Sequence, residues 1–198
     1  MRKLVAVTFV TLDGIMQAPG GPGEDDSGGF KSGGWSVNYW DDIVSQAMGE
    51  IFAKRPELLL GRKTYDIMAA YWPHHDDEGP EMNSAKKYVV STTLDRVDWN
   101  NSTLIKGDVV KEITRLKELD GPELQVHGSS NLIQTLLKYN LIDELHLKIF
   151  PVAIGNGKRL FGEGTNPSGF KLLDSKTSST GVIIATYEQS GELKTGSF

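Results

Sequence analysis

Two segments of the chain combine glycine, hydroxyl groups and cations in an order that suits phosphate binding. The first is Gly61-Arg62-Lys63-Thr64, which follows the apolar run Leu58-Leu59-Leu60. If a helix capped by Thr64 begins here, its free backbone N–H groups and its dipole would attract an anion, and Arg62 and Lys63 would add positive charge. The spacing fits an ordinary strand–helix turn with exposed basic side chains equally well, so both interpretations stay open.

The second segment is Gly128-Ser129-Ser130-Asn131-Leu132, which follows a strand-like run ending at His127. Its glycine permits close approach of a ligand to the backbone, and its serines offer donors for a diphosphate. The pattern is not the G-x-G-x-x-G fingerprint, so we do not predict a Rossmann fold. A third segment, Ser91-Thr92, places hydroxyl groups where a strand ends; they suit contacts to a nucleotide 2′-phosphate or a plain polar strand end.

All three segments follow predicted strands. Ligands of open α/β sheets bind outside the carboxyl ends of the strands. We therefore expect one phosphate-rich ligand to contact all three segments.

Four further side chains are candidates for contact with a substrate. Asp13 follows the first predicted strand, where it would face the substrate or form a turn with Gly14. His127 ends a strand, either as a proton donor or as a structural histidine. Trp35 and Trp40 would stack on a flat heterocycle or pack at the start of the first helix.

The elements that position these residues alternate between strands and helices. Short apolar runs rich in β-branched residues indicate strands over residues 3–10, 57–60, 86–91, 103–105, 123–127, 143–150, 169–177 and 181–188. Apolar residues at helical spacing indicate helices over residues 39–54, 64–70, 108–119 and 131–139, the third capped by Asp108. This order predicts an α/β fold with a mostly parallel sheet and an antiparallel C-terminal edge.

Two long loops interrupt the pattern. Residues 17–34 contain seven glycines, two prolines and the acidic run Glu24-Asp25-Asp26, which suits a flexible lid or a disordered connector. Residues 71–84 are rich in proline, histidine and acidic side chains. Their run His74-His75-Asp76-Asp77-Glu78 lacks metal-ligand spacing, so we predict a solvated loop and no metal site.

Composition narrows the function classes. A chain of 198 residues with 38% hydrophobic residues fits a single domain over residues 1–198. The chain has no cysteine, which excludes disulfides, thiolate nucleophiles and cysteine–zinc sites. A formal net charge of −5 argues against nucleic acid as the main partner, and no apolar run is long enough to span a bilayer. We expect a cytoplasmic protein that binds a small molecule.

Nine segments in a fixed order carry a resemblance to a known family over almost the whole chain. They are Thr11-Leu12-Asp13-Gly14, Gly61-Arg62-Lys63-Thr64-Tyr65, Tyr71-Trp72-Pro73, Lys87-Tyr88-Val89-Val90-Ser91, Trp99-Asn100-Asn101-Ser102-Thr103, Val126-His127-Gly128-Ser129, Leu141-Ile142-Asp143-Glu144-Leu145, Phe150-Pro151-Val152 and Gly155-Asn156-Gly157-Lys158-Arg159-Leu160-Phe161. The chain resembles the reductase domain of riboflavin biosynthesis, the C-terminal half of the bifunctional deaminase-reductase, within the dihydrofolate reductase-like superfamily. The resemblance implies a dihydrofolate reductase-like three-layer α/β/α sandwich.

The resemblance also implies an NADPH site and hydride transfer to a small heterocycle or a ribosylaminopyrimidine. It places the diphosphate and 2′-phosphate side on Gly61, Arg62, Lys63 and Thr64, the adenosine ribose beside Ser91 and Thr92, and the diphosphate and ribose within Gly128, Ser129, Ser130, Asn131 and Leu132. It favours a site role for Asp13. The cations Arg62 and Lys63 are the physical reason to expect NADPH rather than NADH.

The substrate side departs from both groups of relatives. Riboflavin reductases carry Glu-Gly-Gly before the last helix, where this chain has His127-Gly128-Ser129. Dihydrofolate reductases carry an acidic residue on the first helix, at a position that falls near Ser45 here. We therefore predict an NADPH-dependent reductase, with an NADP(H)-binding module that lacks turnover as the alternative. We also expect a homodimer that pairs through residues 142–161.

Overall fold

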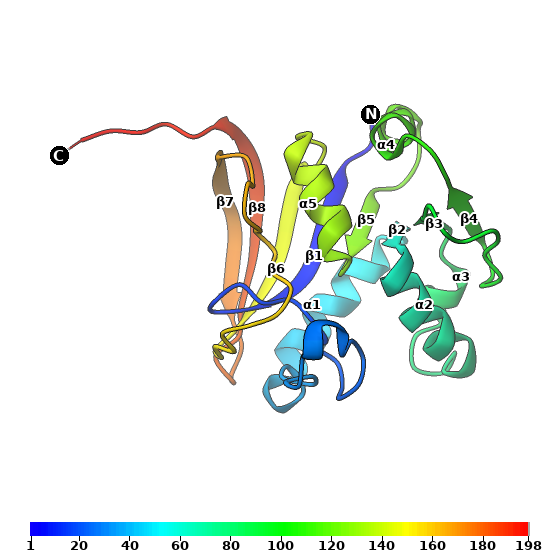
Figure 1. Ribbon diagram of the computed structural model, residues 1–198. Helices are drawn as coiled ribbons and strands as arrows, with labels where there is room; N and C mark the ends of the chain where they lie inside the picture. The colour runs from blue at the N-terminus through cyan, green and yellow to red at the C-terminus, as the bar shows by residue number, and fades with distance from the viewer. Residues whose placement is uncertain (198) are drawn as a thin grey trace.

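The strands form one mixed sheet in the computed structural model, which describes residues 1–197 (Figure 1). They are β1 (Leu4–Thr11), β2 (Glu57–Gly61), β3 (Lys87–Val90), β4 (Ser102–Ile105), β5 (Leu124–His127), β6 (Glu144–Phe150), β7 (Ser168–Thr177) and β8 (Ile183–Glu192). Their order across the sheet is β4-β3-β2-β5-β1-β6-β8-β7. The first six strands of this order are parallel, whereas β8 and β7 pair antiparallel. The predicted mostly parallel sheet with an antiparallel C-terminal edge is confirmed.

Helices cover both faces of this sheet. They are α1 (Asp42–Ala53), α2 (Arg62–Tyr71), α3 (Pro80–Ser84), α4 (Val109–Glu118) and α5 (Ser130–Lys138), with short 3-10 turns η1 (Ser27–Gly29), η2 (Val37–Tyr39) and η3 (Trp72–His74). The alternation of side chains along β1 explains the layers. Leu4 and Ala6 pack with Ile133 of α5, while Val5 and Ile51 of α1 pack together on the opposite face. The predicted three-layer α/β/α architecture is confirmed.

The parallel strands place their carboxyl ends at a common edge, where the predicted ligand segments lie. Gly61 ends β2, Ser91 follows β3 and Gly128 follows β5. Because β3, β2 and β5 are neighbours in the sheet, the three segments come from adjacent strand ends. The fold therefore supplies the juxtaposition on which the ligand prediction depends.

Two helix starts differ from the prediction. α2 begins at Arg62 with Gly61 as its N-cap, so Thr64 lies within the first turn and does not cap the helix. α1 begins only after Asp41, because the Asp41 carboxylate accepts a hydrogen bond from the Val44 N–H at 2.9 Å and caps the helix.

The glycine-rich segment, residues 17–34, is folded rather than disordered. Phe30 is buried against Ile15 and Ala18. The Gln17 side-chain amide donates to the carbonyl oxygens of Asp25 and Ser27, each at 2.9 Å. These contacts offset the conformational entropy that so many glycines lose on folding.

Residues 71–84 contain η3 and α3. The run of residues 74–78 ends η3 and continues as a turn with mostly exposed side chains, which fits the predicted solvated loop. Met82 is buried, and the Trp99 indole N–H donates to the Asn83 side chain at 2.8 Å. The His75 ring stacks on Tyr71 with 3.8 Å between ring centroids. Within residues 1–197, no three His, Cys, Asp or Glu side chains are grouped so that they could hold a metal ion.

The strand in residues 142–161 is internal. β6 is flanked by β1 and β8, so the expectation that this strand pairs with a second copy of the chain is wrong. The homodimer itself stays a prediction. None of the described helices has the length and apolar character needed to cross a membrane.

Candidate functional site

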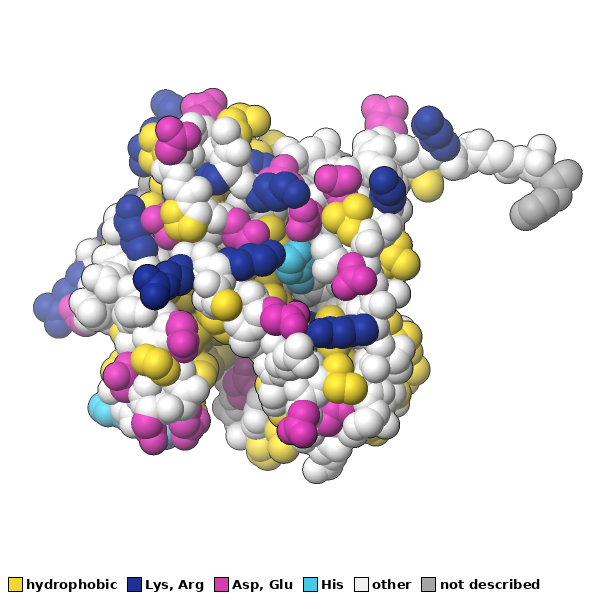
Figure 2. Space-filling model, turned by 180° about the vertical axis from the view of Figure 1, so that it is seen from behind, with side chains coloured by type: hydrophobic (Ala, Val, Ile, Leu, Met, Phe, Trp, Pro, Cys, Tyr) yellow, Lys and Arg dark blue, Asp and Glu magenta, His cyan; other side chains and the backbone are white. Residues whose placement is uncertain are grey.

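A cavity of about 990 Å³ opens at the carboxyl-end edge of the sheet. Its volume lies in the range of sites that enclose ligands of drug or cofactor size. Its walls come from the end of β1, from α1, from the first turns of α2 and α5, and from residues 16–25 of the glycine-rich segment. Seen from behind, the molecule is hollowed at its lower edge, between the part that carries α2 and the part that carries α1 (Figure 2).

The first turns of α2 and α5 reach this cavity without a side-chain cap. The N-caps are Gly61 for α2 and Ser129 for α5, and neither side chain caps its helix in the described chain. By contrast, α1 and α4 are capped by the carboxylates of Asp41 and, as predicted, Asp108. Uncapped first-turn N–H groups are anion ligands, and both sets lie on one cavity.

Glycines allow these two turns to meet. The Gly61 N–H donates to the Ser129 hydroxyl at 2.9 Å, and that hydroxyl donates to the Thr64 hydroxyl at 2.7 Å. A Cβ at Gly61 would lie 3.2 Å from the Ser129 Oγ. Gly128 has a φ of +55°, and a Cβ there would lie 3.4 Å from the Thr64 Oγ1. The structure therefore brings together, on the wall of one cavity, the two segments that the sequence singled out first.

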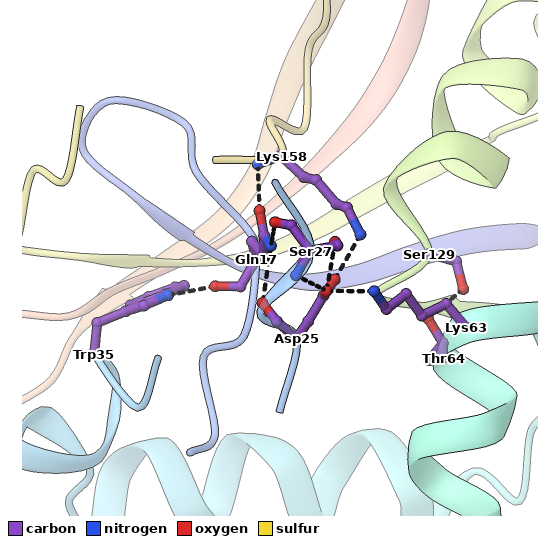
Figure 3. A network of polar contacts seen from close by, with 8 residues as sticks. All are labelled: Gln17, Asp25, Ser27, Trp35, Lys63, Thr64, Ser129 and Lys158. Carbon is purple, nitrogen blue, oxygen red and sulfur yellow. Dashed lines mark hydrogen bonds and ion pairs between the residues drawn. The ribbon is translucent and has the colours of Figure 1, made fainter. Parts of the chain in front are cut away.

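Cations of the cavity wall have acidic partners. Arg62 pairs with Asp66 at 3.2 Å on the exposed side of α2. The ammonium groups of Lys63 and Lys158 both pair with the Asp25 carboxylate, each at 2.6 Å (Figure 3). Burial alone would raise the pKa of Asp25, but hydrogen bonds from these lysines hold the pKa of the carboxyl well below its usual value.

The third predicted segment does not reach the cavity. The Ser91 hydroxyl accepts hydrogen bonds from the N–H groups of Thr93 at 3.2 Å and Leu94 at 3.0 Å, so it closes a local turn after β3. Neither Ser91 nor Thr92 lines the cavity wall. Their role beside the adenosine ribose stays a prediction.

The other end of the cavity is largely apolar. Val7, Phe9 and Met48 line it, together with His127. The His127 ring stacks on Phe52 with 5.4 Å between centroids, and its Nε2 lies 2.9 Å from the Gln125 side-chain oxygen. Burial, reinforced by the charges of nearby basic side chains, lowers the pKa of His127 to about 3. Its environment therefore favours the neutral imidazole at physiological pH, and the predicted proton-donor role of His127 stays untested.

Asp13 lies outside the cavity wall. Its carboxylate accepts hydrogen bonds from the Thr11 hydroxyl, from the Gly155 N–H at 2.6 Å and from the Ile154 N–H at 3.2 Å. The bonds from Thr11 and Gly155 lower the pKa of Asp13 to about 2. The carboxylate therefore joins the end of β1 to the segment after β6, and its predicted catalytic role stays untested.

The two tryptophans lie beside the cavity rather than in its wall. The Trp35 indole donates to the Gln17 carbonyl at 2.7 Å. The Trp40 indole donates to the Ser45 hydroxyl at 2.7 Å, and its ring meets the edge of Phe9 at 5.5 Å between centroids. Trp40 thus reaches the cavity only through Phe9, and the substrate roles of both tryptophans stay predictions.

The acidic side chains of the described cavity wall are Glu24 and Asp25, both from the glycine-rich segment. Glu24 accepts from the Gly20 N–H at 2.6 Å, and burial raises the pKa of its carboxyl. Sequence reasoning missed Asp25 and Lys158 as site residues, because they are 133 positions apart and no local motif links them. The only signal was that both lie in glycine-rich runs that the fold brings back onto the cavity.

Comparisons with known proteins agree with this geometry. The sequence profile of the RibD C-terminal domain matches residues 2–184. The uncharacterized Bacillus subtilis (strain 168) protein YyaP is 30% identical over 196 residues, which cover 96% of each chain. A proposed riboflavin biosynthesis protein from Shewanella sp. PV-4 superimposes with a TM-score of 0.73 at 24% identity, over 95% of this chain and 99% of its own. Dihydrofolate reductase from Enterococcus faecalis, solved with NADP(H), gives a TM-score of 0.61 at 12% identity, over 95% of this chain and 96% of its own. The fold is therefore dihydrofolate reductase-like.

Proposed function

The chain belongs to the RibD C-terminal domain family, and on that premise we propose that it is a reductase that takes a hydride from NADPH. The proposed acceptor is a small heterocycle or a ribosylaminopyrimidine. The observation that carries the proposal is a single cavity with two unlike ends. One end holds the uncapped N-termini of α2 and α5 beside Arg62 and Lys63, and the other is walled by Val7, Phe9 and Met48.

The charged end suits a dinucleotide phosphate. First-turn N–H groups of α2 and α5 would hold the diphosphate, and Gly61 and Gly128 let these two turns approach each other closely. The cations Arg62 and Lys63 favour a cofactor with an additional phosphate. Related dihydrofolate reductase from Enterococcus faecalis was solved with NADP(H), which supports this choice of cofactor.

The apolar end suits a flat acceptor ring. NADPH supplies the hydride when bound, so the side chains need only orient the ring and exclude water. Phe9 and Met48 offer apolar surface, and neutral His127 offers a ring nitrogen for a hydrogen bond. Residues 16–25 of the glycine-rich segment also line the cavity, which fits the predicted lid.

A second candidate is an NADP(H)-binding module without turnover. Its support is that, within residues 1–197, α1 contributes no carboxylate to the cavity wall. Ser45, near the position where dihydrofolate reductases carry an acid, is exposed and accepts a hydrogen bond from the Trp40 indole. The two candidates both bind the cofactor and differ in whether the bound cofactor is oxidised.

An absorbance assay of NADPH oxidation separates the reductase from the binding module. The acceptors supplied are ribosylaminopyrimidines and reduced or oxidised pterins. The proposed reductase oxidises NADPH with at least one of these acceptors, and Met48→Glu, which places a charge in the apolar end, abolishes that turnover while NADPH still binds. Cofactor binding without oxidation by any acceptor would establish the module instead. An Asp95→Asn variant, altered in an exposed ion pair with Lys106 outside the cavity wall, is the control.

A further inference from the structure

Asp25 sits where two cations from distant parts of the chain converge. Lys63 contacts one carboxylate oxygen at 2.6 Å and Lys158 contacts the other at 2.6 Å. The Ser27 hydroxyl and N–H donate to the first of these oxygens at 2.6 Å and 3.1 Å. Figure 3 shows both lysine ammonium groups converging on the carboxylate, Lys158 from above it and Lys63 from the side of α2. The Asp25 side chain is only 10% exposed, so this group is enclosed within the cavity wall.

Backbone contacts hold both lysines in place without help from Asp25. Lys63 lies in the first turn of α2. The Lys158 N–H donates to the Gln17 side-chain oxygen at 3.0 Å, and its carbonyl accepts from the Met16 N–H at 2.8 Å. The backbone positions of both lysines therefore do not depend on the Asp25 carboxylate.

The charges of the groups in direct contact do not balance, because the neighbouring Glu24 carboxylate accepts from the Gly20 and Gly21 N–H groups and not from the lysines. Two ammonium groups face a single carboxylate, and Lys63 also lies beside the uncapped first turn of α2. A phosphate carries more charge than a carboxylate and has three acceptor oxygens, so it satisfies two ammonium groups and a helix N-terminus more fully.

We propose that Lys63 and Lys158 form a phosphate-binding subsite of the cavity and that the Asp25 carboxylate competes with phosphate for it. The Asp25 carboxylate of the glycine-rich segment thus occupies the subsite when no ligand is bound, and a ligand phosphate must displace this carboxylate. The source of the phosphate is the cofactor or a phosphorylated substrate. That choice rests on the proposed function, whereas the subsite does not.

Calorimetric titration with inorganic pyrophosphate tests the subsite directly. Asp25→Asn removes the competing charge, so pyrophosphate should bind about tenfold more tightly than to the unaltered chain. Lys158→Met removes one cation and should weaken binding about tenfold, while Lys158→Arg should restore it. Each effect should shrink at high ionic strength.

Asp95→Asn is the matched control for Asp25→Asn, because it neutralises an acid in an exposed ion pair with Lys106 at 3.1 Å. If Asp25→Asn and Lys158→Met both bind pyrophosphate like this control, the cluster only holds the segment in place and the proposal is wrong. Circular dichroism checks that each variant is folded. Should Lys158→Met fail to fold, Asp25→Asn decides alone, provided that its circular dichroism spectrum and unfolding transition match those of Asp95→Asn.

Three phosphate ligands then identify the source. If the subsite takes the 2′-phosphate, Asp25→Asn tightens NADPH but not NADH; if it takes the diphosphate, both tighten. If it takes a substrate phosphate, only ribose 5-phosphate tightens. No change with all three ligands would overturn the subsite. Pyrophosphate binding that matches the expected pattern, in a chain that never oxidises NADPH, would sink the proposed function and leave the subsite standing.

Discussion

Single side chains under α1 show how polar groups are enclosed in this fold. Gln125, His127, His146 and Lys148 come from β5 and β6 and are all buried. The strand register places them on the same face of the sheet as Val5 and Val7 of β1. The His127 ring forms a hydrogen bond with the Gln125 side-chain oxygen, and the His146 ring lies 2.9 Å from the Glu144 carboxylate. Burial without enough compensating charge shifts the pKa values of these bases downward.

His127 should not titrate in the physiological range. Its pKa is lowered from 6.5 to about 3, so between these values the unfolded chain binds a proton that the folded chain does not. Its contribution to stability is present above pH 6.5 and is lost as the pH falls toward 3. We expect His127→Gln to weaken the acid sensitivity of unfolding over this window. An NMR titration that shows an imidazole pKa between 6 and 7 for His127 would contradict this assignment.

Lys148 should destabilise the fold most below neutral pH. The side chain is 1% exposed, and burial followed by the charge of Lys176 lowers its pKa to about 7, with no acidic partner in the described residues to oppose them. The folded chain loses this proton well before the unfolded chain, so stability rises as the pH increases from 7 toward 10.5. Lys148→Met should therefore stabilise the protein by about 1 to 3 kcal/mol at pH 6 and by less at pH 10.

Denaturant unfolding at both pH values measures this effect. Lys106→Met, at an exposed lysine, is the control and should change stability by less than about 0.5 kcal/mol. A loss of stability in Lys148→Met at every pH would mean that the buried ammonium is favourably solvated within the fold.

At the scale of elements, side-chain capping distinguishes α1 and α4 from α2 and α5. α1 and α4 start with an aspartate that satisfies a first-turn N–H group. α2 and α5 start at Gly61 and Ser129, which leave these groups free at the cavity. A missing cap costs an isolated helix about 1 kcal/mol. That cost is offset when the same N–H groups bind a phosphate.

Lys87 holds together the elements beside α2. Its ammonium donates to the carbonyl oxygens of Asn83 at 3.0 Å, Ala85 at 2.8 Å and Asn100 at 3.1 Å. It thereby joins the end of α3 to the turn before β4. Lys87→Met leaves these acceptors without a donor and should destabilise the protein by about 2 to 3 kcal/mol.

The neighbouring Lys86 provides the control for this prediction. Its side chain is 53% exposed and its ammonium lies 4.0 Å from Glu57. Lys86→Met should cost less than about 0.5 kcal/mol in the same thermal or denaturant unfolding experiment. Equal effects of the two substitutions would show that the Lys87 contacts contribute nothing specific.

At the scale of the whole molecule, the fold was predictable because a short apolar run in the sequence indicates each strand locally. Runs such as Leu58-Leu59-Leu60 can be satisfied only in a strand covered on both faces, and the strand–helix alternation then requires a mostly parallel sheet. Predicted helix starts were less accurate at α2, because Thr64 contacts Ser129 of another helix instead of capping its own. That tertiary hydrogen bond has no signature in the neighbouring sequence.

The candidate site was predictable where one segment supplies its own chemistry. Gly61-Arg62-Lys63-Thr64 and Gly128-Ser129-Ser130-Asn131-Leu132 both line the cavity, because strand ends of a parallel sheet share an edge. The pairing of Asp25 with Lys158 could not be foreseen, since it depends on how two glycine-rich loops fold. Asp13 shows the converse case. Its local motif suggested a site role, but its carboxylate lies outside the cavity wall and accepts hydrogen bonds from the Ile154 and Gly155 N–H groups.

The central claim is that this cavity binds NADPH through the first turns of α2 and α5. Fluorescence titration tests it most directly, because Trp72 lines the cavity and its emission should change when a ligand fills the cavity. We predict saturable NADPH binding in the micromolar range that weakens about tenfold in Lys63→Met and is unchanged in Asp95→Asn. No binding at millimolar NADPH, or equal affinity in Lys63→Met and the unaltered chain, would contradict the account.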